Sequence, residues 1–159
     1  MGLAETSQIW VEQTCQGLHL TPPCKTLDEV VAAIAAALKR PIDIGLHDME
    51  GSDIYGFCTT RDGRYKIAMS YQATRRQFIR TVLHELVHIL KGDVTPDRPA
   101  IVYREEISLR DPHELEVEAC AQALVSYLRV GPVSAPDDAT SSQEQGLARF
   151  WDELGGFDR

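Results

Sequence analysis

Apolar residues recur every three or four positions in three stretches of this sequence, which is the spacing of one buried face of an α-helix. Each stretch follows a residue that caps helix N-termini, and capping boxes or a proline at the first helical position support the same starts. The predicted helices begin at the caps Thr26, Thr74 and Asp111 and end before Pro41, near Lys91 and near Arg129. Residues 143–154 predict one more amphipathic helix.

Three shorter stretches between the first two helices predict a small sheet. Residues 42–46 form an apolar run, residues 54–59 form a second strand, and residues 65–70 alternate between apolar and polar. The Asp62-Gly63 pair between the last two is a strong signal for a hairpin turn, so we expect an antiparallel sheet. Residues 100–103 can add a short strand. The pattern predicts an α+β fold.

The 159 residues fit one domain with an extension at each end. Residues 1–25 carry weak patterns and are predicted to be an N-terminal extension. Residues 26–131 contain the strong helix and strand patterns and form the predicted domain. Residues 132–159 are predicted to be a linker followed by the helix at 143–154.

Charge and apolar run length exclude several classes of protein. The net charge of -8 argues against a nucleic-acid-binding role, which requires a basic face. Residues 1–10 lack the features of a signal peptide, and the longest apolar run, 30–38, is too short to span a bilayer. The cysteines are scattered, as in proteins with reduced thiols. We expect a cytoplasmic protein that binds neither nucleic acid nor membrane.

The middle helix contains His84-Glu85-Leu86-Val87-His88, an H-E-x-x-H motif. Residues four apart lie on one face of a helix, so both imidazoles can bind one Zn²⁺ at roughly 2.0–2.1 Å. Glu85 lies beside the open coordination position, where it can accept a proton from water. The motif predicts His84 and His88 as zinc ligands and Glu85 as general base.

A catalytic zinc site needs a third protein ligand, and the next helix offers three glutamates. At about 100° per residue, Glu114 and Glu118 lie on a polar face. Glu116 lies on the opposite face among small residues, where a carboxylate is costly unless it is paired or bound to a metal. Helical geometry favours Glu116, with Glu118 and Glu114 as alternatives. Tyr103 and His113 are candidates to donate a hydrogen bond to the reaction oxyanion.

The sequence HELVH, a spacer of under thirty residues and EVEACAQAL resemble the ImmA/IrrE group of metallopeptidases. In that group an E-x-E-A-(N/D/E)-x-x-A motif follows HELGH, and its first Glu, which corresponds to Glu116 here, binds zinc. The resemblance covers residues 27–128. It implies a zincin-like fold, a gluzincin-type zinc endopeptidase, and a protein substrate, often a helix-turn-helix repressor in stress or mobile-element regulation.

Two residues depart from the pattern of that group. Val87 stands where glycine is usual, and Cys120 replaces a polar residue that commonly supports a metal-bound histidine. These departures motivate a second hypothesis, a regulatory binding module that keeps the fold but cuts little or no protein. A third hypothesis is a component of a toxin–antitoxin pair.

Overall fold

A computed structural model describes the chain except for residues 23–25, 48–55, 72–73, 98–101, 105–110 and 130–159. The elements are α1 (Leu3–Gly17), α2 (Leu27–Leu38), β1 (Ile42–His47), β2 (Gly56–Arg61), β3 (Arg64–Ser70), α3 (Arg75–Leu90), β4 (Val102–Arg104) and α4 (Pro112–Leu128). The predicted α+β fold class is confirmed. The predicted linker and last helix, over 132–159, lie outside the described residues.

The helix starts follow from their capping residues. The Thr26 side chain accepts a hydrogen bond from the Glu29 amide at the start of α2. A complete capping box between Thr74 and Gln77 opens α3. Asp111 caps α4, and a proline occupies its first turn. Within the described ranges, no helix has both the length and the hydropathy needed to cross a membrane.

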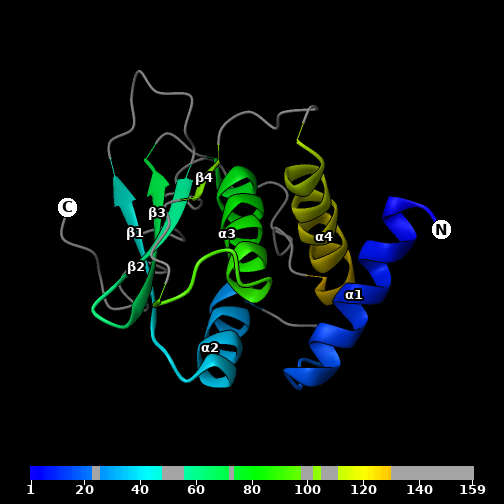
Figure 1. The fold of residues 1–159 in the computed structure, drawn as a ribbon, viewed down its shortest axis with the longest axis horizontal. Coiled ribbons are helices and arrows are strands. Elements are labelled where there is room, and N and C mark those ends of the chain that lie inside the picture. Colours follow the sequence, from blue (N-terminus) through cyan, green and yellow to red (C-terminus); the bar gives the residue numbers. More distant parts are fainter. Residues whose placement is uncertain (23–25, 48–55, 72–73, 98–101, 105–110, 130–159) are drawn as a thin grey trace, which may run out of the picture.

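The elements form successive layers around α3 (Figure 1). The sheet packs against one side of α3 and α4 packs against the other, while α1 covers the outer side of α4. Leu83 and Leu86 of α3 are fully buried in the core. This arrangement places α3 at the centre of the molecule, where His84, Glu85 and His88 are shielded from water.

The strand order is β1-β3-β2-β4. Strands β2 and β3 form the predicted antiparallel hairpin, and Asp62 and Gly63 in its turn have φ angles of 53° and 74°, as a type I′ turn requires. The prediction of a wholly antiparallel sheet was wrong, because β1 pairs in parallel with β3, with Ile44 opposite Ile67. The hairpin turn fixes the direction of β2 and β3 and carries no information about β1.

Helix α1 was not predicted from the sequence. Val11 and Cys15 on this helix are fully buried, and the helix packs against α4. The signal was weak because no side chain caps the helix at Gly2 and because the polar Ser7 lies on its buried face. The N-terminal residues therefore contribute to the same hydrophobic core as the rest of the described chain.

Candidate metal centre

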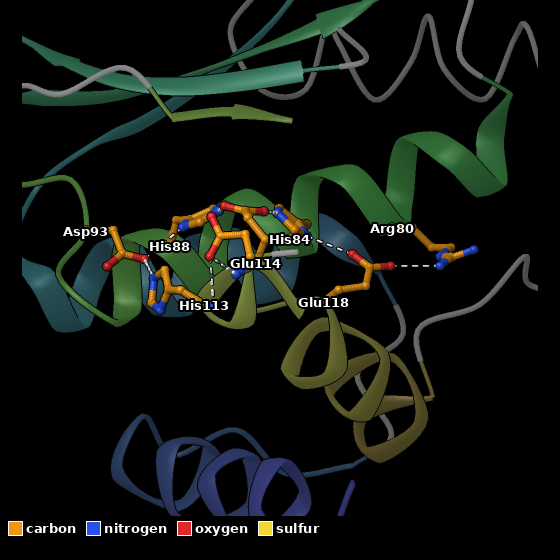
Figure 2. A network of polar contacts seen from close by, with 8 residues as sticks. Arg80, His84, His88, Asp93, His113, Glu114 and Glu118 are labelled. Atoms are coloured by element: carbon orange, nitrogen blue, oxygen red, sulfur yellow. Dashed lines mark hydrogen bonds and ion pairs between the residues drawn. The ribbon is translucent and has the colours of Figure 1, made fainter. Parts of the chain in front are cut away.

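Helix α3 presents two imidazoles to α4. His84 and His88 lie one turn apart, their ring centroids are 4.9 Å apart, and both side chains are almost completely buried. Figure 2 shows both rings in the space between the two helices. Two buried imidazoles on one helix face are costly unless their ring nitrogens have polar partners.

Glu114, in the first turn of α4, contacts both imidazoles. Its Oε2 lies 3.1 Å from His84 Nε2, and its Oε1 lies 3.1 Å from His88 Nε2. The three side chains form a group that could hold a metal ion. The Glu114 side chain is 22% exposed, whereas both histidines are closed off, so solvent reaches the group from the α4 side.

The structure does not bring Glu116, the predicted third ligand, to the histidines, because its carboxylate pairs elsewhere. Glu116 Oε1 pairs with Lys91 Nζ at 3.0 Å, and its side chain is 43% exposed. The small-residue face of α4 packs against α1 instead of α3, since Cys120 lies beside Ser7 of α1. The face of α4 that was expected to be exposed to solvent carries Glu114, and this face packs against the histidines of α3. The sequence analysis assigned this face to α3 because it did not predict α1, the helix that covers it.

Both imidazoles are also held from behind by carboxylates. Glu118 Oε2 lies 2.7 Å from His84 Nδ1, and Asp93 Oδ2 lies 2.7 Å from His88 Nδ1. An ionised carboxylate can only accept, so each Nδ1 donates its proton. In a neutral imidazole this leaves the lone pair on Nε2, on the side of Glu114. Metal-binding histidines commonly have such a partner on the other ring nitrogen.

Gly92 places Asp93 beneath His88. Its φ angle is 78°, a left-handed conformation that ends helices and that glycine adopts without strain. The chain then turns back, and the Asp93 amide donates to the carbonyl of His88 at 3.0 Å. Asp93 therefore contacts His88 twice, through its amide to the His88 carbonyl and through its carboxylate to the His88 ring.

The donor set fits a divalent metal ion. Tetrahedral zinc bonds of about 2.0–2.1 Å place ligand atoms roughly 3.3–3.4 Å apart, close to the two 3.1 Å nitrogen–oxygen spacings around Glu114. Among the described residues, the buried His88 Nε2 has no hydrogen-bond partner, because its 3.1 Å contact with Glu114 lacks the geometry of a hydrogen bond. A metal ion bound by both Nε2 atoms and Glu114 would satisfy this nitrogen.

The charges around the histidines favour a cation between them. Burial lowers the pKa of His88, but the carboxylates of Glu114 and Asp93 outweigh it, so that the pKa is raised overall. The close contacts of Glu114 with His84 and His88 hold the pKa of its carboxyl well below its usual range. Without a metal, these carboxylates therefore favour a proton on His88 Nε2, on the side where a metal ion would bind.

Zinc affinity is therefore expected to fall as the pH falls through the raised pKa of His88. A proton must leave the imidazole before the metal binds, so the affinity should drop by about tenfold for each pH unit below that raised pKa. The Glu114 carboxylate stays ionised as His88 titrates, since its pKa is lowered. Competition with a coloured chelator at each pH measures the effect, and circular dichroism checks that the fold persists. A pH-independent affinity would contradict this account.

The remaining predicted catalytic residues lie at different depths. Glu85 is fully buried next to Cys58 of β2: burial raises the pKa of that thiol, and the Glu85 carboxylate raises it further. His113 is 49% exposed, donates from Nε2 to Asp93 Oδ2 at 2.7 Å, and has its ring centroid 6.0 Å from that of His88. Tyr103 pairs with Phe57 through the backbone of β4, and its side chain lies outside the described residues.

Sequence reasoning gave too little weight to Glu114 and Glu118 and missed Asp93. Glu114 and Glu118 are four residues apart on α4, as His84 and His88 are on α3. Two helices with paired polar residues at this spacing can place one carboxylate on the metal side of an imidazole and the other behind it. That matched spacing was the signal available in the sequence.

Removing either supporting carboxylate is expected to weaken metal binding. We expect Asp93→Asn and Glu118→Gln each to lower zinc affinity by about 10–100-fold, because the imidazole loses its charged orienting partner. Isothermal titration measures the change. Asp43→Asn is the matched control, since Asp43 pairs with Arg64 on the sheet and its loss should leave zinc affinity unaltered. Equal affinities in Asp93→Asn and Asp43→Asn would show that Asp93 has no supporting role.

The histidines, Glu114 and their supporting carboxylates thus form one buried cluster built from α3, α4 and the turn after α3 (Figure 2). Comparison of the sequence with protein-family models and with curated proteins gave no match.

Proposed function

We propose that this protein is a zinc-dependent endopeptidase with a zincin-like fold, similar to the ImmA/IrrE group. The observation that carries the proposal is the meeting of His84, His88 and Glu114 at one point, with Glu85 of the H-E-x-x-H motif in the same helical turn. A catalytic zinc of this type has two imidazoles and one carboxylate as protein ligands, and its fourth position is open to water or substrate. The ligand that completes the set is Glu114, two residues before the position that the resemblance implied.

The catalytic steps follow from the residues around this point. When bound, Zn²⁺ polarises a carbonyl and lowers the pKa of water at its open position. Glu85 takes the proton of the attacking water and passes it to the leaving amine. Glu85 is buried next to the protonated Cys58, and this burial keeps bulk water away from the proton transfer. His113, whose Nε2 donates to Asp93 at the exposed rim, is the candidate donor to the oxyanion through Nδ1 when its imidazole is protonated.

The sheet offers a binding edge for an extended substrate. Strand β4 pairs with β2 on one side, packs against α3, and has no other strand partner among the described residues. A peptide can add to such an edge through backbone hydrogen bonds. We therefore propose a protein substrate bound as a strand along β4. A helix-turn-helix repressor is the candidate that the resemblance implies, and a toxin–antitoxin role is a third hypothesis.

One reason for the alternative, a regulatory binding module, is weakened by the structure. Cys120 was suspected of replacing a residue that supports a metal-bound histidine. It lies beside Ser7 of α1 instead, and the support comes from Glu118 and Asp93. Val87, the other departure, is fully buried in the core. The binding module therefore rests on Val87, and proteolysis is the better-supported proposal.

The test is cleavage of a protein by the zinc-loaded full chain. The protein should be incubated with unfolded β-casein and with a repressor encoded beside it, and the products identified by mass spectrometry. Cleavage that stops on chelation and returns with zinc would support the proposal. If both proteins stay intact with zinc fully bound, and the repressor forms a stable complex, the binding module is correct instead.

A further inference from the structure

A cavity of about 200 Å³ lies between α3 and α4, next to the metal centre. It is lined by Arg80, Glu118, Ala121, Gln122, Val125 and Ser126. Glu118 belongs to both sites, since it also holds His84 Nδ1. Figure 2 shows the order along the two helices, from the histidines through Glu118 to Arg80. The volume is below the roughly 300–1,000 Å³ of most small-molecule pockets, so the cavity suits a single side chain or chain end.

The polar groups of this cavity favour a negatively charged ligand. Glu118 already uses both oxygens: Oε1 accepts from Arg80 Nη2 at 2.8 Å, and Oε2 accepts from His84 Nδ1 at 2.7 Å. Arg80 has five N–H donors in a planar fork, and its side chain is 44% exposed. The Gln122 amide and the Ser126 hydroxyl add two more donors at the rim.

We propose that this cavity binds a carboxylate group of a peptide, with the Arg80 guanidinium as its principal contact. Arginine forks match planar carboxylates in geometry and charge. Ala121 and Val125 supply an apolar wall for the methylene groups that carry the carboxylate. Because Glu118 joins the cavity to His84, the bound residue would lie close to the scissile bond. This reading as a substrate subsite rests on the proposed function, whereas carboxylate binding itself does not.

Nuclear magnetic resonance of the zinc-loaded full chain tests the proposal with small probes. N-acetyl-glutamic acid α-amide should shift the backbone amides of Gln122 and Ser126 and the side-chain N–H of Arg80 in a saturable way. N-acetyl-glutamine α-amide should bind at least about tenfold more weakly, because it lacks the charge. N-acetyl-alanine carries a C-terminal carboxylate, and comparing it with the glutamate probe identifies which carboxylate the site prefers. Equal binding of the acid and its amide analogue would overturn the proposal.

Variants separate this cavity from the metal and from the fold. Ser126→Leu should block the rim of the cavity and reduce glutamate-probe binding about tenfold or more, with Gln16→Leu at an exposed position of α1 as the matched control. Arg80→Lys keeps the charge next to Glu118 but loses the planar fork, and should also weaken binding. Probe binding that survives both changes would show that the carboxylate binds outside this cavity and would overturn the proposal. Loss of proteolysis alone, with probe binding intact, would count against the enzyme proposal only.

Discussion

Replacing Glu114 by alanine is expected to lower zinc affinity roughly a thousandfold, whereas Glu116→Ala should leave it within about twofold. A structural zinc site gains about 10–16 kcal/mol from its ligands, so one ligand of three is worth several kcal/mol, or about three powers of ten. Glu114 contacts both Nε2 atoms at 3.1 Å, while Glu116 pairs with Lys91. Isothermal titration or chelator competition measures both affinities.

The two alanine variants also control for each other, since both shorten a glutamate on the same helix. Glu116→Ala removes an ion pair that is partly exposed, which should cost at most about 1 kcal/mol of folding free energy. X-ray anomalous scattering at the zinc edge of the parent protein should show Glu114 bound to the metal. A Glu116→Ala protein that loses zinc, beside a Glu114→Ala protein that keeps it, would refute the assignment.

Glu85→Gln should lower the rate of peptide hydrolysis by about 10²–10⁴-fold while zinc remains bound. Glutamine has the same shape but cannot accept the proton of the attacking water. The side chain is fully buried, and a neutral amide is cheaper to bury than a carboxylate. The variant should therefore melt at the same temperature as the parent or higher. Zinc content by mass spectrometry, melting by calorimetry and rate with a cleaved substrate give the three readouts.

The matched control for this change is Glu29→Gln, at an exposed position in the first turn of α2. It removes one carboxylate far from the centre and should leave the rate unaltered. A Glu85→Gln protein as active as Glu29→Gln would show that another group serves as base. A Glu85→Gln protein that loses its zinc would show that Glu85 holds the metal.

Local rules predicted much of this fold. The caps at Thr26, Thr74 and Asp111 and the turn at Asp62-Gly63 act through contacts within a few residues, and the structure has each of them. The parallel pairing of β1 with β3 joins residues far apart in sequence. Alternation of apolar and polar residues indicates a strand without indicating the direction of its neighbour.

The sequence predicted the residues of the centre that lie on one helix, α3. It did not predict which residue of a second helix, α4, contacts them. His84, Glu85 and His88 follow from the period of α3 alone. The choice among the α4 glutamates depends on which face of α4 meets α3, and α1 decides that by covering the face of Cys120. Asp93 was missed because its role depends on the backbone reversal at Gly92. Each error concerns packing between segments.

The position of α4 between α3 and α1 links the N-terminal helix to the candidate metal centre. Glu114 sits on one side of α4, and on the other side Lys91 bridges Glu116 to the Trp10 ring of α1. Substitutions that loosen α1 would therefore weaken zinc binding without touching a ligand. By the reciprocity of linked equilibria, zinc would in turn slow hydrogen exchange at the buried amides of α1. The first helix thus shares in the energetics of a site that none of its side chains contacts.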